Sequence, residues 1–281
     1  MCGGRRWIGW PQAREAFWQV LSADERARAE RFRFDHHRHH YIVGRGVLRG
    51  INGRYLQISP AAVQFSYGEF DKPALVNEPA LQFNVSHSHG KLLLAFAWQT
   101  PIGVDIEQVR LLDDMDAIAR RFFSAAENED YANAGAAPKP ELFFNCWTRK
   151  EAFIKAVGDG LSFPLAEFDV SLLPGEPAAL LTVRGSAQEA ARWSMRSFDP
   201  FPGYRGALIV QSEMPACLFL MGSDRVNIIL WRGLPGGITE DSLLFCLTNR
   251  PLCRKLSTVY TINASQINEK PINWVRENAS P

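Results

Sequence analysis

Several features that would place a protein in a special class are scarce in this sequence. No apolar run approaches the ~18–20 residues that a membrane-spanning helix needs, so we expect no membrane contact. The five cysteines stand at irregular positions without metal-binding spacing, and residues 1–10 are too charged for a secretory signal, which fits a reducing cytoplasm. A net charge of +1 argues against binding to nucleic acid or another bulk polyanion. We expect a cytoplasmic monomer.

The composition is that of an ordinary globular protein. Of the 281 residues, 46% are hydrophobic and 22% are charged, and this length allows two domains or one domain with an extension. Helical and alternating segments are mixed along the chain, which predicts an α+β fold with helices packed on antiparallel sheets. We expect two similar halves, 1–100 and 101–212, followed by an extension of unknown role at 213–281, with disorder as one alternative.

The periodicity of apolar residues, together with the turn and capping residues between them, predicts the helices and strands. Helices are expected at 13–21, after Ser22 in a capping box with Glu25, at 41–56, at 117–123, after Ser124 with Glu127, and at 143–155. Strands are expected at 63–67, 81–85, 92–98, 102–107, 161–170, 179–183, 192–198 and 207–211, with a loop at 135–140.

The stretch from Phe143 to Lys155 is predicted to form a helix. It contains neither Pro nor Gly, and Glu151 and Lys155 are four residues apart, so a helix places both on one face. Such pairs are common on exposed helices. Large apolar side chains around Trp147, however, predict a helix that is buried over much of its circumference. Charges on a buried helix need charged partners or an anionic ligand.

Residues 102–107 alternate strictly between apolar and other residues. Ile102, Val104 and Ile106 point one way, and the carboxylates of Asp105 and Glu107 point the other way, ~6.6 Å apart along the strand. This face is either a solvated outer surface or a pair of hard oxygen ligands for Mg²⁺.

Residues 86–90, Ser-His-Ser-His-Gly, are expected to form a polar turn between two strands. Adjacent Ser and His residues cannot form the hydrogen bond of a hydrolase triad, and no nucleophile-elbow pattern surrounds Ser86. The segment is either a plain β-turn or a phosphate-binding turn that offers hydroxyls, imidazoles and backbone N–H groups.

Basic and histidine-rich segments precede these motifs. Arg28 and Arg31 belong either to a solvated helix face or to an anion site. His36 and His40 have i,i+4 metal spacing but no evident third ligand, so adventitious metal affinity is the better interpretation. Gly44-Arg45-Gly46 lies inside an expected helix and not after a strand, which excludes a dinucleotide motif.

Four motifs in order resemble those of the Sfp-type 4'-phosphopantetheinyl transferases, closest to their bacterial and cyanobacterial branch. They are Phe83-Asn84-Val85-Ser86-His87-Ser88, Ile102-Gly103-Val104-Asp105-Ile106-Glu107, Phe122-Phe123-Ser124 with Glu127, and the helix from Trp147 to Lys155. Each motif alone is weak, but the four in order are specific. The resemblance covers about residues 5–212.

The resemblance implies an enzyme that transfers 4'-phosphopantetheine from coenzyme A to a serine of an apo acyl or peptidyl carrier protein and releases 3',5'-ADP. By motif, Asp105, Glu107 and Glu151 resemble the family's Mg²⁺ ligands, and Glu151 its general base. Lys155 resembles the lysine that binds phosphate and protonates the departing nucleotide. The positions that resemble coenzyme A contacts are Arg28, Arg31, Lys72, Asn84, Val85, Ser86, His87 and Lys155.

One departure concerns the family's Gly-Lys-Pro, in which Asp71 replaces the glycine before Lys72 and brings an acid near a phosphate site. Two other functions stay open at this point. One is a Mg²⁺-dependent phosphohydrolase acting on a nucleotide, and the other is an inactive paralogue that binds coenzyme A or a carrier. The sequence does not identify the carrier protein or its pathway.

Overall fold

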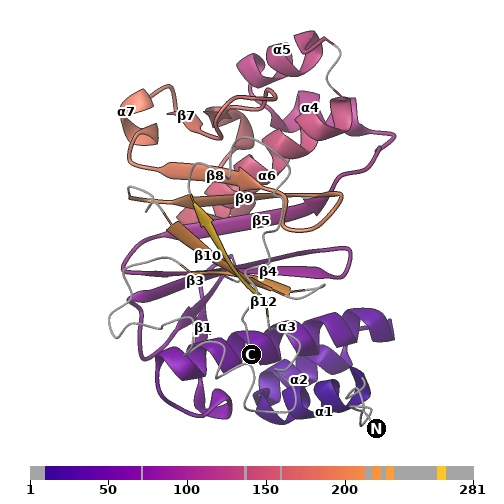
Figure 1. The fold of residues 1–281 in the computed structure, drawn as a ribbon, viewed down its shortest axis with the longest axis vertical. Coiled ribbons are helices and arrows are strands. Elements are labelled where there is room, and N and C mark those ends of the chain that lie inside the picture. The colour runs from indigo at the N-terminus through magenta and orange to yellow at the C-terminus, as the bar shows by residue number, and fades with distance from the viewer. Residues whose placement is uncertain are drawn as a thin grey trace, which may run out of the picture. The chain divides into compact units, whose positions relative to one another are not determined.

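The chain divides into two compact units in the computed structural model (Figure 1). The structure describes residues 10–70, 72–135, 138–158, 160–212, 217–222, 226–230 and 258–263. Among these, residues 10–65 and 75–78 form the first unit, and the others form the second.

The described helices agree with the expected ones apart from their ends, except that the short helix at Ala187–Ala190 was not predicted. They are α1 (Trp10–Val20), α2 (Ala23–Glu30), α3 (Asp35–Tyr55), α4 (Met115–Phe122), α5 (Ala125–Asn133), α6 (Lys139–Val157) and α7 (Ala187–Ala190), with 3-10 turns at Pro60–Ala62, Gly160–Ser162 and Leu165–Glu167. The strands are β1 (Phe65–Tyr67), β2 (Pro73–Leu75), β3 (Leu81–Ser88), β4 (Lys91–Trp98), β5 (Ile102–Gln108), β6 (Phe168–Val170), β7 (Leu180–Val183), β8 (Ser194–Phe198), β9 (Tyr204–Val210), β10 (Cys217–Gly222), β11 (Val226–Leu230) and β12 (Thr258–Asn263).

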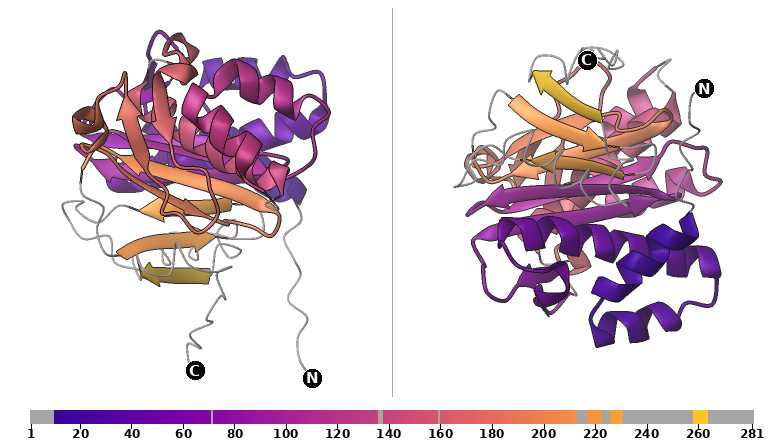
Figure 2. Two further views of the ribbon diagram at one scale, coloured as in Figure 1. Left: turned by 90° about the horizontal axis from the view of Figure 1, so that it is seen from above. Right: turned by 60° about the horizontal axis from the view of Figure 1, so that its bottom comes forward.

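Helices α1, α2 and α3 make up most of the first unit and lie side by side in the right-hand view of Figure 2, where they are drawn in indigo. Leu21, Ala29 and Ile42 are buried between them. The predicted capping box at Ser22 is confirmed, because the Glu25 carboxylate accepts the Ser22 backbone N–H at 3.0 Å.

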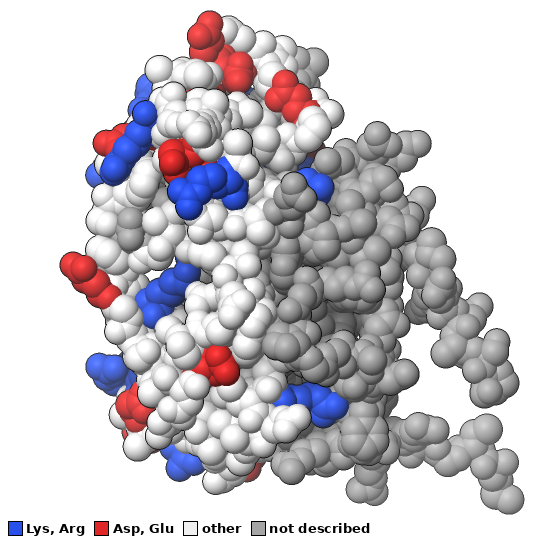
Figure 3. All heavy atoms as spheres, turned by 90° about the vertical axis from the view of Figure 1, so that its left-hand side faces the viewer, with Lys and Arg blue, Asp and Glu red and all other residues white. Residues whose placement is uncertain are grey.

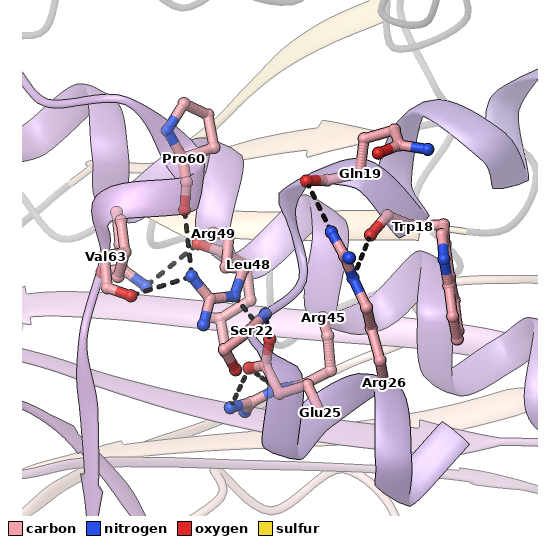
Figure 4. Close-up of polar contacts among 11 residues, drawn as sticks. Trp18, Gln19, Ser22, Glu25, Arg26, Arg45, Leu48, Arg49, Pro60 and Val63 are labelled. Atoms are coloured by element: carbon pink, nitrogen blue, oxygen red, sulfur yellow. Dashed lines mark hydrogen bonds and ion pairs between the residues drawn. The ribbon is translucent and has the colours of Figure 1, made fainter. Parts of the chain in front are cut away.

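The same Glu25 carboxylate holds two arginines of α3 (Figure 4). It lies 2.6 Å from Arg45 Nη2 and 2.6 Å from Arg49 Nε, and both Glu25 and Arg49 are buried. Arg49 also donates to the carbonyls of Pro60 and Val63. Arg45 therefore has a structural role, in agreement with the exclusion of a dinucleotide motif there.

Two predicted helix starts are wrong, and the strand predicted at 161–170 is present only as β6, after two 3-10 turns. Helix α3 begins at Asp35 and not at 41, so His36 and His40 lie in its first two turns. Helix α6 begins at Lys139, and Pro140 stands in its first turn and not in a loop. A proline is tolerated there because the first N–H groups of a helix have no intrahelical acceptor.

The second unit contains the longer sheets. Strands β5, β9 and β8 form an antiparallel sheet in the order β5-β9-β8. A five-stranded sheet has the order β12-β10-β11-β4-β3, antiparallel except for the parallel pair β11–β4. The predicted α+β fold with antiparallel sheets is thereby confirmed, whereas the division at residue 100 stays a prediction. Strands β10, β11 and β12 belong to the segment 213–281, whose role remains unassigned.

Helix α6 packs against β5 and β9 and is surrounded by the core of the second unit. Twelve of its 19 residues are buried, including Phe143 and Phe153, which confirms the predicted burial. Trp147 is only partly buried and stacks on Phe143 with ring centroids 5.9 Å apart. Gly103 of β5 lets the backbone of α6 approach closely, because a Cβ there would lie 2.0 Å from the Ala152 carbonyl oxygen.

The described helices include none that is long and apolar enough to cross a membrane. Among the described residues on the face drawn in Figure 3, basic and acidic side chains are interspersed without a large area of one sign. This distribution agrees with the small net charge.

Candidate active site

The two acids of β5 do not lie on a solvated outer face. Asp105 is only 3% exposed, and Glu107 is partly buried. The strand pairs with β9 along one edge, while its other edge and one face meet β3 and α6. The alternative of a solvated face is therefore wrong for Asp105.

Helix α6 brings a second pair of charges to the same region. The Lys155 ammonium lies 2.5 Å from Asp105 Oδ1 and 3.1 Å from Ser86 Oγ. Ser86 in turn donates its hydroxyl proton to Asp105 Oδ1 at 2.8 Å. Residues from β3, β5 and α6, which are up to 69 positions apart in the sequence, thus meet at one carboxylate.

Negative charge exceeds positive charge among these groups. Burial raises the pKa of Glu151 to about 7; the Lys155 ammonium opposes this rise, and the charges of Asp105 and Glu107 add to it. Burial also raises the pKa of Glu107, with a contribution from Asp105. Lys155 acts on both glutamates and Arg110 acts on Glu107, so three carboxylates face two cations and a further cation would relieve their repulsion.

The predicted metal ligands are not gathered into a ready-made site. Among the described residues, no three His, Cys, Asp or Glu side chains are arranged so that they could hold a common ion. The Lys155 ammonium lies against Asp105 instead. Asp105 Oδ2, however, is buried and has no hydrogen-bond partner among the described residues. A buried carboxylate oxygen without a partner suits a hard cation, so the donor set fits Mg²⁺ in its chemistry.

A pocket of about 300 Å³ opens beside Glu151 and Lys155. Its lining includes Lys72, Asn84 and Val85, three of the residues expected to contact coenzyme A, together with the apolar side chains of Phe70, Pro73, Phe83 and Ile154. An apolar wall with a few convergent polar groups is typical of a small-molecule site. The structure thus brings Lys72, Asn84, Val85, Glu151 and Lys155 together around one cavity.

Lys72 lies across the end of α6. Its ammonium donates to the carbonyl oxygens of Lys155 at 2.6 Å and Ala156 at 3.1 Å, and burial lowers its pKa to about 8. The helix ends at Gly158, whose φ of 92° is in the left-handed region that glycine adopts without strain. Lys72 therefore supplies a cation at the negative end of the helix dipole.

The predicted polar turn at 86–90 is wrong in extent. Ser86, His87 and Ser88 continue β3 and pair with Leu93, Leu92 and Lys91 of β4, and only His89 and Gly90 form the turn. Their backbone is therefore part of a strand ladder and is not a free phosphate-binding turn. Ser86 is buried against Asp105, whereas His87 is exposed.

Two further predicted positions belong to the first unit. Arg28 in α2 and Arg31 at its end are exposed residues of the first unit, and Arg28 packs over the Tyr41 ring. Asp71 lies outside the described residues.

Both parts of the chain are similar to known protein families. The profile of the 4'-phosphopantetheinyl transferase superfamily matches residues 101–209, and that of the N-terminal part of a 4'-phosphopantetheinyl transferase matches residues 5–99. The 4'-phosphopantetheinyl transferase HetI of Nostoc sp. is 41% identical over 184 residues, which are 64% of this chain and 74% of the relative. The chain belongs to the 4'-phosphopantetheinyl transferase superfamily.

Other relatives support the same family assignment. Sfp of Bacillus subtilis, also a 4'-phosphopantetheinyl transferase, is 35% identical over 158 residues, which are 56% of this chain and 69% of Sfp. Among solved structures, the holo-[acyl-carrier-protein] synthase of Thermotoga maritima is 19% identical over 44% of this chain and 70% of its own, with a TM-score of 0.33. That structural likeness is too weak to support any inference. The Sfp-type resemblance stated from the motifs is confirmed.

Sequence reasoning missed two sets of buried polar residues near the site of the transferase. Lys150 is fully buried, lies 2.7 Å from Glu127 and donates to the carbonyls of Leu165 and Phe168. Ser88 donates to Glu107 at 2.7 Å. The signal for Ser88 was the spacing of Asn84, Ser86 and Ser88 at every second position, which is the period of a strand and not of a turn.

Proposed function

We propose that the transferase moves the 4'-phosphopantetheine group of coenzyme A to a serine hydroxyl of an apo acyl or peptidyl carrier protein. The serine oxygen forms a new bond to the phosphorus that bears the pantetheine arm. The bond from that phosphorus to the bridging oxygen of the diphosphate breaks, and 3',5'-ADP leaves. The observation that carries the proposal is the placement of Glu151 and Lys155 together on the wall of one pocket beside Asp105.

Glu151 is the candidate general base. A serine hydroxyl is a weak nucleophile at neutral pH, and a carboxylate that takes its proton contributes ~10²–10⁴-fold in rate. A pKa near the operating pH is best suited to this role, and burial raises the pKa of Glu151 to about 7. The rigid helix α6 fixes the carboxylate beside the cavity.

Lys155 is the candidate partner of the leaving group. Negative charge grows on the departing phosphate, and a positioned ammonium stabilises it and can supply a proton. In the structure Lys155 is paired with Asp105 and is 28% exposed, so its side chain is accessible to a ligand. Lys72, Asn84, Val85, Ser86, His87, Arg28 and Arg31 are proposed as further contacts of coenzyme A.

Asp105, Glu107 and Glu151 are proposed to hold Mg²⁺. The ion would supply positive charge that stabilises the diphosphate during transfer. The buried Asp105 Oδ2 without a partner and the mutual repulsion of the three acids support this assignment. Because Lys155 lies against Asp105, loading of the ion requires these side chains to rearrange.

The deciding experiment is incubation with coenzyme A, MgCl₂ and a panel of apo carrier proteins, followed by intact-mass measurement. We expect one carrier to gain the mass of one phosphopantetheine, and its Ser→Ala variant to gain none. Phosphate release from coenzyme A without a carrier would identify a phosphohydrolase instead. Binding of coenzyme A without any mass gain on any carrier would identify an inactive binder. The cytoplasmic location and the monomeric state stay predictions.

A further inference from the structure

Strand β3 is joined to β5 by side chains that replace a backbone ladder. Asn84 Oδ1 accepts the Val104 N–H at 2.9 Å, Ser86 Oγ accepts the Ile106 N–H at 3.3 Å, and Ser88 Oγ accepts the Gln108 N–H at 3.3 Å. Both series advance by two residues, so every second side chain of β3 serves every second N–H group of β5. Buried N–H groups need such acceptors, which explains three polar residues on a strand in the interior.

Whether β3 uses an amide or a hydroxyl in this ladder depends on the neighbouring residue of β5. Asn84 and Val104 form the rung beside Gly103, which has no side chain to bind. The two following rungs lie beside acids, and there the ladder uses hydroxyls. Ser86 donates to Asp105 at 2.8 Å and Ser88 donates to Glu107 at 2.7 Å. A hydroxyl has one proton to donate and two lone pairs to accept with, so it can bind an N–H group and a carboxylate together.

The rung at Ser88 differs from the rung at Ser86 in one respect. Asp105 has a second partner, the Lys155 ammonium, whereas the Ser88 hydroxyl is the hydrogen-bond donor that the described residues offer to Glu107. His89 Nδ1 lies 3.0 Å from Ser88 Oγ. Because the hydroxyl proton is committed to Glu107, the imidazole must present an N–H at Nδ1. Ser88 thus accepts from the Gln108 backbone and the His89 ring, and its hydroxyl can turn only toward Glu107.

We propose that Ser88 is a positioning residue that holds the Glu107 carboxylate in the orientation in which it binds Mg²⁺. This inference rests on the proposed function, because it assumes that Glu107 is a ligand. Ser88 is 8% exposed and has no free lone pair for a ligand, so it acts through Glu107 and not on the coenzyme. Loss of an outer partner of a metal ligand costs ~10–100-fold in metal affinity.

The test compares the wild type with Ser88→Ala, Ser88→Thr and the control Ser66→Ala, whose hydroxyl is exposed. Two quantities are measured against MgCl₂ concentration: the melting temperature without coenzyme A and the rate of carrier modification at saturating coenzyme A. We expect Ser88→Ala to need about tenfold or more MgCl₂ for half of each effect. The KM for coenzyme A at saturating MgCl₂ should change little, and Ser88→Thr and Ser66→Ala should resemble the wild type.

Equal MgCl₂ dependence in Ser88→Ala and the wild type would overturn the positioning role while leaving the transferase function in place. A wild type that modifies no carrier and is not stabilised by MgCl₂ would overturn the proposed function and this inference together. Ser88→Ala also removes the acceptor of the Gln108 N–H and can weaken the fold. Ser88→Cys fills the position with a slightly larger side chain that is a weaker donor, so it should show the same shift in MgCl₂ dependence in a folded protein.

Discussion

Replacement of Gly103 by alanine tests whether the main-chain contact between β5 and α6 sets the geometry of the site. A Cβ at this position would lie 2.0 Å from the Ala152 carbonyl oxygen and 2.5 Å from the Ala156 backbone nitrogen. Ordinary contacts begin at 3.4 Å, so the Cβ and the Ala152 oxygen would have to separate by about 1.4 Å, and α6 would have to move away from the sheet. The obstacle is backbone on a buried helix, which cannot turn aside as a flexible side chain can.

The expected cost follows from this geometry. Overpacking of a core costs ~1–3 kcal/mol and occasionally more, and a clash with backbone belongs at the upper end. About 3 kcal/mol corresponds to a fall of roughly 6–12 °C in the melting temperature for a protein of this size class. Gly50 provides the matched control, because it lies within α3 and a Cβ there meets no atom within 4 Å. Gly50→Ala should raise stability by ~0.5–1 kcal/mol through the better helix propensity of alanine.

Urea unfolding measures the free energy of unfolding of both variants, and the transfer assay measures their rate of phosphopantetheine transfer. Glu151 precedes Ala152 on α6, while Asp105 follows Gly103 by two residues on β5. A shift of about 1 Å between catalytic groups can cost ~10²-fold in rate. We expect Gly103→Ala to lose activity at a temperature at which it remains folded. If it were as stable as the wild type, or less stable with full activity, the close contact would not determine the site.

Three further predictions concern charged residues. Asp105→Asn should abolish phosphopantetheine transfer in the mass assay, whereas Asp130→Asn, at an exposed position, should retain it; full activity of the first variant would exclude Asp105 as a ligand. Lys150→Met should lower the free energy of unfolding by ~3–5 kcal/mol, because it leaves Glu127 buried without its cation. Lys139→Met breaks an exposed pair with Asp116 and should cost less than ~1 kcal/mol, and similar costs for the two lysines would contradict this reasoning. The pKa of Glu151 is raised in the folded protein from 4.5 to about 7, so its contribution to stability is present below pH 4.5 and lost as the pH rises through 7. In urea unfolding with EDTA, the wild type should lose more stability between pH 5 and pH 7.5 than Glu151→Gln, and equal losses would refute the raised pKa.

The sequence was sufficient for the elements with a clear period. The alternation of 102–107 and the apolar residues around Trp147 predicted β5 and a buried α6, and both are present. These signals are local, because each residue's place on a face depends only on its neighbours along the chain. The same locality let the capping boxes at Ser22 and Ser124 be recognised.

Polar residues in the interior could not be placed in the same way. The sequence around Ser86 and Ser88 is typical of a turn, because serine is common in turns and usually avoids buried strands. Their place in β3 depends on N–H groups and carboxylates of β5 about 20 residues later. Lys150 is a similar case, since its partners come from α5 and from the segment 165–168. The sequence of a helix shows that a residue is charged, but it does not show whether residues distant in the sequence supply the partners that allow its burial.

Two different contacts therefore control the acids of the site, and they can be separated by experiment. The contact at Gly103 sets how far β5 lies from α6, and thus the spacing of Asp105 from Glu151. The Ser88 hydroxyl accepts the Gln108 N–H and, in the proposal above, orients the Glu107 carboxylate. A misoriented carboxylate can still bind Mg²⁺ when the ion concentration is high enough. A displaced helix cannot return to its place, because its backbone would then clash with the added Cβ. Excess MgCl₂ should therefore restore the rate of Ser88→Ala and leave Gly103→Ala impaired; the same response in both variants would show that orientation and spacing are not separate functions of these two residues.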